Sequence, residues 1–430
     1  MNPLLLLMGS FFLIVILKVP IVFAFMISSI ITLSYLRMPM MSVLNHVYSS
    51  IDSFPLLAVP FFLLLGQLMN QGGITERLVT LSDKLVGHVR GGLGHVNVMV
   101  SMLFAGLSGS SVADTAGIGA MLIPAMKKAK FDVGFSAAVT ACSSVLGGII
   151  PPSIIMVVYA SLARISVGAL FLSGVIPGVM IALSQMGYTY YMAVKHNYQP
   201  ANPRFSLIEA AKALWKAIPP LMMPLIIIGG ISAGIFTATE AAAVAVVYGL
   251  VLVFGVYRSM RFRDLPGLMG RALVGYSLPM MAVAASGIMG WLIAYLNAPE
   301  IILSFILGIT EAPFGIAMLI VAFLLVLGTF LSPIISVVVF LPIIQALGAA
   351  AGLAPIHLGI IVVLTLSLGR VTPPYGICML VAAQIAEIPN HKVFVASVPM
   401  IVLAIGIIIV GIVFPGLFMA LPRLLMPQYL

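Results

Sequence analysis

The sequence predicts an all-α polytopic membrane protein made of two inverted-topology repeats, each with a re-entrant helical hairpin and an interrupted helix. Three observations predict this fold. Of the 430 residues, 62% are hydrophobic and 7% are charged, whereas a soluble domain is about 25% charged. Two long apolar stretches are broken in the middle by Gly, Ser and Pro. Two Pro-Pro pairs and two glycine-containing breaks recur at one fixed spacing.

Apolar segments that could cross a bilayer recur along the whole chain. A crossing helix needs about 20 apolar residues for ~30 Å of hydrocarbon, and fewer where the bilayer is thinned. No soluble-looking domain separates the apolar segments. The expected crossings lie near residues 4–17, 20–36, 54–71, 133–163, 168–193, 219–235, 238–257, 274–296, 358–386 and 394–420.

Two further apolar stretches, 92–126 and 313–347, are too long for a single crossing. The first is interrupted by the run GLSGSS from Gly106, and the second by the run GTFLSP from Gly328. Breaks of this composition predict re-entrant hairpins with their tips at the breaks. A long kinked helix is the alternative interpretation.

The loop charges place the two hairpins on opposite sides of the membrane. Lys and Arg concentrate in cytoplasmic loops, and three basic residues flank the first hairpin on each side, within 72–92 and 127–130. The loops around the second hairpin, 297–312 and 348–358, contain no Lys or Arg. We therefore expect the first hairpin to enter from the cytoplasm, the second to enter from outside, and both chain termini to be external.

The net charge of +9 comes from basic residues scattered over short loops. Cytoplasmic loops explain this charge without a nucleic-acid partner. Arg37 and Arg423 fall on the external side and are exceptions to the pattern. Cys142 and Cys378 lie in apolar segments, so we expect neither a disulfide nor a transition-metal site.

An internal repeat relates the two halves of the chain. The run GGIIPPS from Gly147 matches the run GRVTPPY from Gly369, and the spacing between these runs equals the spacing between Gly106 and Gly328. Each half contains five expected crossings, an odd number, so the second copy must be inverted relative to the first. The predicted division is a first repeat over 1–194, a cytoplasmic connector over 195–217 and a second repeat over 218–430.

The Pro-Pro pairs lie where a helix must unwind at membrane depth. Proline removes a backbone hydrogen bond and clashes with the preceding turn. Backbone groups freed in this way survive in a membrane only where they are buried or line a cavity. Freed carbonyls and helix C-termini favour a cation such as sodium, whereas helix N-termini favour an anionic group. Paired breaks at matching positions therefore predict a binding site, and a simple packing kink is the alternative.

Four motifs resemble one known family, in that family's order and over nearly the whole chain. They are GLSGSSVADTAGIG from Gly106 with the following IPAM, GIIPPS from Gly148, GIFTATEAAA from Gly234 and TPPYG from Thr372. Together they resemble the large, DctM-type subunit of tripartite ATP-independent periplasmic (TRAP) transporters.

The resemblance implies a sodium-coupled importer of an acidic solute, such as a C4-dicarboxylate, a keto acid or a sugar acid, in a bacterial or archaeal inner membrane. It also implies a small four-helix membrane subunit and a periplasmic substrate-binding protein as partners. The implied mechanism is of the elevator type. A transport domain, here about 92–163 plus 313–386, would slide against a scaffold formed by the remaining helices.

Carried onto this sequence, the resemblance implies at least two sodium sites, one where each hairpin tip meets its broken helix. Hydroxyl and carbonyl oxygens suit such a hard cation. The expected sodium-binding residues are Ser108, Ser110, Ser111, Gly147 and Pro151 in the first site, and Thr329, Ser332, Gly369, Thr372 and Pro373 in the second.

Arg370 departs from the apolar residue that is common at its position in the family. An arginine at membrane depth is a functional hypothesis by default, and Arg370 could bind a substrate carboxylate in bidentate fashion. The alternatives are a pair with Asp114 or snorkelling toward the cytoplasm. We expect Arg370, Ser153 and Asp114 to be substrate-binding, although Asp114 could instead tune a sodium site or cap a hairpin arm.

Other functions are less well supported by the sequence. The GLSG run resembles an intramembrane serine protease motif, but a nucleophilic serine needs a histidine base, and His95 lies at the far end of the same hairpin. No metalloprotease motif or phosphate-binding loop is present, so we expect no enzymatic activity. A standalone sodium-coupled anion symporter or antiporter of similar fold is the closer competitor, and an ion channel is less consistent with occluded sites.

Overall fold

The computed structural model describes residues 2–202 and 204–429, and every regular element within them is a helix. Eight helical segments in this part of the chain are long and apolar enough to cross a membrane. The prediction of an all-α polytopic membrane protein is therefore confirmed. These segments are Phe54–Gln71, Val167–Lys195, Leu207–Ser232, Ala238–Val256, Phe262–Tyr295, Pro313–Phe330, Pro333–Ala350 and Asn390–Val413.

The first half of the chain runs from α1 to α10, and the second half from α11 to the C-terminus. The first-half helices are α1 (Pro3–Ile16), α2 (Ile21–Tyr35), α3 (Met41–Ile51), η1 (Phe54–Leu57), α4 (Ala58–Gln71), α5 (Ile74–Val86), α6 (Gly92–Ser108), α7 (Ser111–Lys128), α8 (Val133–Ser144), η2 (Val145–Gly148), α9 (Ile154–Ala163) and α10 (Val167–Lys195). The second-half helices are α11 (Leu207–Ser232), α12 (Ala238–Leu250), η3 (Val251–Val256), η4 (Phe262–Asp264), α13 (Leu265–Tyr295), α14 (Ala298–Leu307), α15 (Pro313–Phe330), α16 (Pro333–Ala350), α17 (Pro355–Gly369), α18 (Ile377–Ala386), α19 (Asn390–Val413), α20 (Pro415–Phe418), α21 (Ala420–Leu425) and η5 (Pro427–Tyr429).

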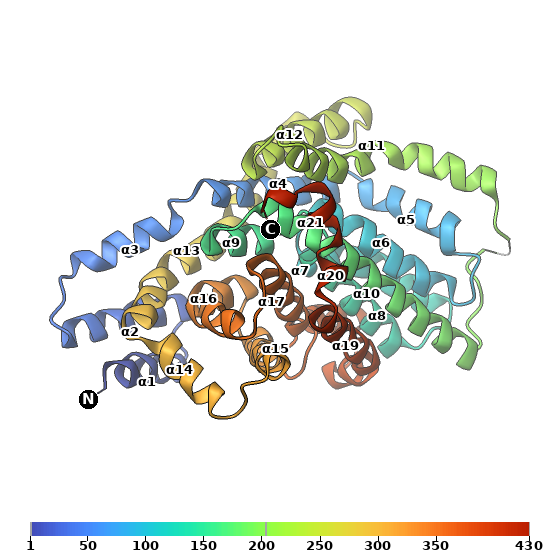
Figure 1. Ribbon diagram of the computed structural model, residues 1–430. Helices are drawn as coiled ribbons and strands as arrows, with labels where there is room; N and C mark the ends of the chain where they lie inside the picture. The colour runs from blue at the N-terminus through green and yellow to red at the C-terminus, as the bar shows by residue number, and fades with distance from the viewer. Residues whose placement is uncertain (1, 203, 430) are drawn as a thin grey trace.

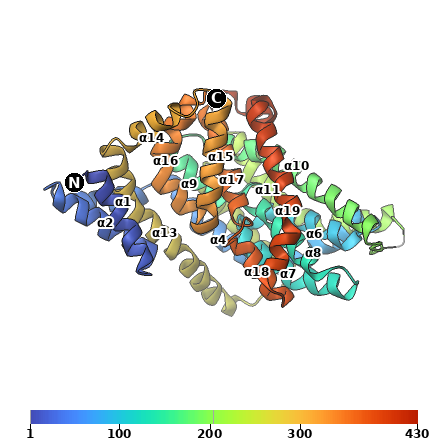
Figure 2. The same cartoon turned by 90° about the horizontal axis from the view of Figure 1, so that it is seen from below.

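The helices recur at the spacing that the sequence motifs gave. Helix α16 corresponds to α7. The first residues of the two helices, and likewise their last residues, are separated by the same number of positions as Gly106 and Gly328. Helices α6, α8, α9 and α10 have counterparts in α15, α17, α18 and α19 near that offset. Helices α1, α2 and α14 lie toward one end of the molecule and α6 and α8 toward the other in both views (Figures 1 and 2). The repeat thus extends from two motifs to a whole series of elements.

Both long apolar stretches are hairpins, and the alternative of a long kinked helix is wrong. Near the open end of the first hairpin, the side-chain amide of Asn97 on α6 lies 3.7 Å from the sulfur of Met126 on α7. In the second hairpin, the rings of Phe323 on α15 and Phe340 on α16 pack edge to face with centroids 5.4 Å apart. Contacts between residues on either side of the break require the chain to reverse direction there.

Polar pairs join the first hairpin to the broken helix behind it. The amide of Asn97 donates to Thr140 on α8 at 2.6 Å, and the hydroxyls of Ser101 and Ser143 are 2.8 Å apart. All four side chains are buried. Small polar residues let membrane helices approach closely while satisfying their hydrogen bonds, so α6 and α8 form one packed unit.

Side-chain caps set where several helices begin. Asp132 accepts from the backbone N–H of Phe135 at 2.7 Å at the start of α8. Thr237 and Glu240 form a capping box at the start of α12, with Glu240 accepting from the backbone N–H of Thr237 at 2.8 Å. Glu240 is therefore a helix-capping residue, and the GIFTATEAAA motif marks a helix start.

The crossings expected at the N-terminus agree with α1 and α2 in their bounds, whereas the helix that follows the expected connector starts earlier than expected. Helices α1 and α2 have 14 and 15 residues, shorter than the about 20 needed for a full crossing. Helix α11 already begins at Leu207, inside the expected connector, because Ser206 caps it and Lys84 of α5 pairs with Glu209 at 2.8 Å. Charged residues in the first three turns, Glu209, Lys212 and Lys216, hid this helix start from a prediction based on hydropathy.

Candidate functional site

The tip of the first hairpin touches the first helix break. Gly109 at the tip adopts a left-handed backbone with φ 63°, and a Cβ there would lie 2.8 Å from the carbonyl oxygen of Pro152. The hydroxyl of Ser111 donates to the carbonyl of Val145 at 3.5 Å. Only glycine combines this φ with so close an approach, so the tip can seat against the Pro-Pro segment. The predicted meeting of tip and break is therefore present.

Asp114 belongs to this contact. The hydroxyl of Ser108 donates to Oδ1 of Asp114, and the backbone N–H of Ser110 donates to the same hydroxyl at 3.3 Å. Oδ2 of Asp114 is buried and has no hydrogen-bond partner among the described residues. A Cβ at Gly147 would overlap this oxygen, so the carboxylate faces the backbone of the break.

Ser153 also lies inside the first break, where its hydrogen bonds are internal. Its hydroxyl donates to the carbonyl of Gly148 at 2.7 Å and accepts from the N–H of Met156 at 3.4 Å, as the N-cap of α9. Pro151 lies at the same contact, with its carbonyl oxygen 3.5 Å from where a Cβ of Gly106 would be. Ser153 is fully buried, which favours a structural role for its side chain.

The second hairpin tip meets the second break in a direct backbone contact. A Cβ at Gly369 would lie 2.6 Å from Cα of Gly328, so the two glycines are in direct contact. The hydroxyl of Thr329 donates to the carbonyl of Val326 at 2.7 Å, and that of Thr372 donates to the carbonyl of Leu368 at 2.9 Å. Each hydroxyl oxygen keeps lone pairs for a further partner.

Ser332 and Pro373 complete the predicted second cluster. Ser332 is the residue before α16 and makes no side-chain capping hydrogen bond. Pro373 lies in the segment between α17 and α18, next to Thr372. The structure thus brings both predicted groups of residues to two tip-and-break contacts, while their roles as ligands stay predictions.

The sequence analysis did not include Ser336 among the candidate site residues, although it is the counterpart of Asp114 in the second repeat. Ser336 follows Asp114 at the repeat offset, both are fully buried, and each has a side-chain oxygen without a partner in the described chain. Ser367 on α17 carries a third such oxygen, 2.7 Å from where a Cβ of Gly148 would be. Applying the repeat offset to Asp114 would have found Ser336.

The two contacts differ in charge. The first combines the Asp114 carboxylate with hydroxyls and backbone carbonyls, whereas the second offers neutral oxygens. Buried polar atoms without partners are uncommon in native proteins and call for an explanation such as an ion or water. A hard cation such as sodium prefers oxygen ligands of this kind, so the donor sets fit sodium, most clearly at Asp114.

A cavity of about 250 Å³ opens beside the second tip. Arg370 lines it, is half-buried, and forms no ion pair or side-chain hydrogen bond with any described residue. An Arg370–Asp114 ion pair is therefore absent from the described part of the chain. The other lining residues are Val112, Gly328, Thr329, Phe330, Leu331, Ser332, Pro333, Tyr375 and Ile377. Val112 comes from the first hairpin, so both repeats contribute to the cavity.

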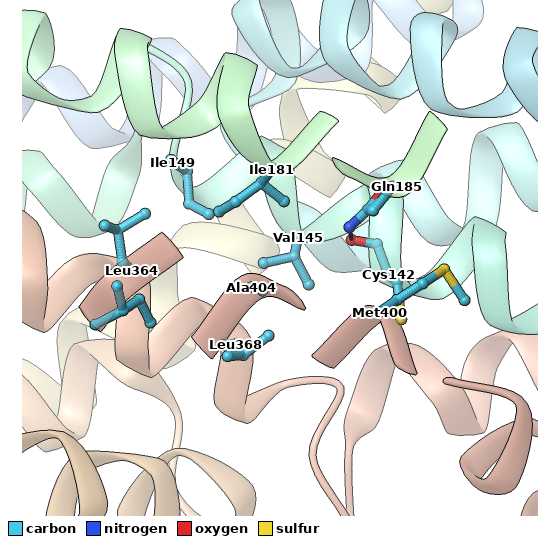
Figure 3. A pocket seen from close by; sticks show the side chains of 10 residues that line it. Cys142, Val145, Ile149, Ile181, Gln185, Leu364, Leu368, Met400 and Ala404 are labelled. Carbon is cyan, nitrogen blue, oxygen red and sulfur yellow. Dashed lines mark hydrogen bonds between the residues drawn. The ribbon is translucent and has the colours of Figure 1, made fainter. Parts of the chain in front are cut away.

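A second, much smaller cavity lies between α8, α10, α17 and α19 (Figure 3). Its volume is about 10 Å³, which leaves room for about one water molecule. Gln185 donates to the carbonyl of Cys142 at 3.0 Å at its edge, and the remaining lining side chains are mostly apolar. This cavity is too small for an organic solute.

The serine protease interpretation finds no histidine at the first tip. Ser108 is bonded to Asp114, whereas the imidazole of His95 is 3.2 Å from the carbonyl of Arg90 near the other end of α6. A nucleophilic serine needs its base within hydrogen-bond reach, and the described geometry does not provide one.

Comparison with known proteins gives one consistent family. The sequence pattern of "Tripartite ATP-independent periplasmic transporter, DctM component" matches residues 8–417. The chain is 37% identical to the sialic acid TRAP transporter large permease protein SiaM of Vibrio cholerae, over 88% of this chain and 89% of that protein. It is 35% identical to the C4-dicarboxylate TRAP transporter large permease protein DctM of Pseudomonas aeruginosa, over 88% of each chain.

A solved membrane transporter shares the fold. The Neisseria gonorrhoeae efflux pump MtrF superposes with a TM-score of 0.58 at 13% sequence identity, over 88% of this chain and 83% of that chain. At this level of identity the likeness concerns the fold alone.

Proposed function

The chain belongs to the DctM family of large membrane subunits of TRAP transporters, and on that basis we propose that it imports an acidic organic solute together with sodium. It is a multi-pass membrane protein, and we place it in the inner membrane of its cell with both termini external. The proposal rests on two charged groups near the two hairpin tips that have no hydrogen-bond or ion-pair partner for part of their polar atoms among the described residues. Asp114 has a buried carboxylate oxygen without a donor, and Arg370 has a guanidinium without an acceptor among the described residues.

Each of these two groups suits one of the two transported species, sodium or the acidic solute. A sodium ion would satisfy Asp114, and a carboxylate would satisfy Arg370 through parallel hydrogen bonds. Val112, two residues before Asp114 in the chain, lines the cavity together with Arg370. A cation that binds beside Asp114 and orders the first tip would therefore also shape the solute cavity, which couples the two binding events.

The packing supports an elevator mechanism. The hairpins and broken helices contact one another, as in the pairs α7 with α18, α8 with α18, and α9 with α16. Helices α2, α3 and α4 instead pack around α13, which also contacts α16. We propose that α6–α9 and α15–α18 move as one body along α13, carrying solute and sodium.

A cysteine pair across α13 and α16 tests this movement. A Cβ at Gly290 of α13 would lie 3.0 Å from the carbonyl oxygen of Val338 of α16. Gly290→Cys with Val338→Cys, in a chain whose Cys142 and Cys378 are replaced by alanine, should lose uptake on oxidation and regain it on reduction. Each single cysteine serves as the matched control. Full uptake by a cross-linked sample would refute movement of α16 along α13.

We propose two partners, a small membrane subunit and a periplasmic substrate-binding protein, because the matching family is tripartite. Uptake into proteoliposomes that hold this chain and its small subunit tests the whole proposal. A panel of radiolabelled organic acids is offered with and without a sodium gradient and the binding protein. Uptake that requires both supports the proposal; sodium-driven uptake without the binding protein would instead indicate a standalone symporter.

A further inference from the structure

We infer that the solute is a small monocarboxylate with an apolar body, and not a dicarboxylate or a sugar acid. This inference rests on the proposed function and narrows it to one substrate class. It is carried by the cavity beside the second hairpin tip, where one cation faces walls that are mainly apolar.

The cavity matches one carboxylate. Arg370 is the one charged side chain among the described residues that line it. A single guanidinium binds one carboxylate through two parallel hydrogen bonds. A C4-dicarboxylate would bring a second negative charge, and within the described lining no cation is present to meet it.

The walls oppose a second charge or several hydroxyls. Phe330, Leu331, Tyr375 and Ile377 supply rings and aliphatic chains, and Val112 adds a branched chain from the first hairpin. A carboxylate pressed against such groups loses its water without gaining a partner, which is costly. A ring or a branched aliphatic chain would instead gain from leaving water.

The cavity has few polar groups to spare. The hydroxyl of Thr329 already donates to the carbonyl of Val326, which leaves the hydroxyls of Ser332 and Tyr375 as the remaining side-chain donors in the described lining. These suit one oxo or hydroxyl oxygen beside the carboxylate, but not the row of hydroxyls on a sugar acid. The volume of about 250 Å³ also lies below the about 300–1,000 Å³ of pockets for drug-sized ligands.

The test compares acids on the complex of this chain with its small subunit in nanodiscs. We would measure the sodium-dependent shift in melting temperature with 4-methyl-2-oxopentanoate, 3-phenyllactate, succinate and N-acetylneuraminate over a concentration series. The two monocarboxylates should reach half-maximal stabilisation at concentrations at least about tenfold lower than the other two acids, a discrimination in the usual range for one mismatched contact. Measuring the membrane complex by itself excludes selection by the binding protein.

The outcomes separate this inference from the proposed function. Stronger stabilisation by succinate or N-acetylneuraminate would overturn the monocarboxylate inference while leaving a sodium-coupled acid transporter. No sodium-dependent effect of any acid here, together with no uptake in proteoliposomes, would overturn both.

A charge added to the cavity gives a second, independent test. Tyr375 is 54% exposed and lines the cavity, so Tyr375→Lys supplies the missing second cation with little packing loss. We expect succinate to gain at least about tenfold relative to 4-methyl-2-oxopentanoate. Tyr375→Gln controls for the lost ring, and Leu207→Lys adds the same charge at an exposed position outside the cavity. An unchanged preference in Tyr375→Lys, and in Leu331→Lys as a second variant, would refute the inference.

Discussion

Replacing Gly369 by alanine should separate the second hairpin tip from its broken helix. The new Cβ would lie 2.6 Å from Cα and from the carbonyl carbon of Gly328, whereas carbon atoms pack at about 3.5 Å or more. The tip must therefore withdraw by about 0.9 Å. Because the obstacle is backbone and not a flexible side chain, we expect a cost of about 1–3 kcal/mol.

That cost falls on the contact where we propose a sodium ion. If sodium binding requires the tip to return to its original position, this cost of about 1–3 kcal/mol is subtracted from the binding free energy. Sodium binding then weakens by about 5- to 150-fold. The assay is a sodium titration of solute uptake in proteoliposomes, with the sodium-induced rise in melting temperature as a second readout. Gly369→Ala should still insert and assemble, since the packing of α15 and α16 away from the tip is untouched.

Gly406→Ala is the matched control. A Cβ at Gly406 of α19 meets no atom within 4 Å, so the same substitution should leave sodium activation unchanged. If Gly369→Ala and Gly406→Ala gave the same half-activating sodium concentration and the same thermal shift, the second tip and break would not form a sodium site.

Substitutions at three further positions test the two clusters and the arginine. Asp114→Asn keeps the shape of the side chain and a hydrogen-bond partner for Ser108, but it removes a charge worth about 4 kcal/mol to a cation ~4 Å away at an effective dielectric of about 20. The half-activating sodium concentration should therefore rise at least about tenfold. An unchanged value in sodium titrations would show that Asp114 is not a sodium ligand. Thr372→Ala should weaken sodium activation by less, because a neutral hydroxyl is lost, while membrane insertion measured by fractionation stays intact; unaltered sodium dependence would exclude the Thr372 hydroxyl. Arg370→Leu should abolish uptake of the native acid and Arg370→Lys should retain part of it, since lysine keeps the charge but not the bidentate geometry; full uptake by Arg370→Leu would leave the arginine a structural role.

Local chemistry explains why the membrane fold could be predicted. Pro-Pro pairs and Gly/Ser/Pro runs interrupt helices wherever they occur, so the breaks after Gly147 and Gly369 were visible without any tertiary information. The offset between these two glycines, which Gly106 and Gly328 share, then predicted the repeat that α7 and α16 display. Hydropathy was less reliable where a helix begins with charged residues, as the early start of α11 shows.

The direction of each side chain at the site was decided only by tertiary packing. Sequence patterns alone predict that polar and small residues gather at two breaks, because those residues are needed for the breaks to form. They did not determine that Asp114 turns toward Gly147, or that Val112 lines the cavity beside the second tip. The position of Val112 depends on how two hairpins from opposite halves of the chain pack, and that of Asp114 on how the first tip meets its break. A helix places neighbouring residues on different faces, so which face meets the cavity is set by the partner helices.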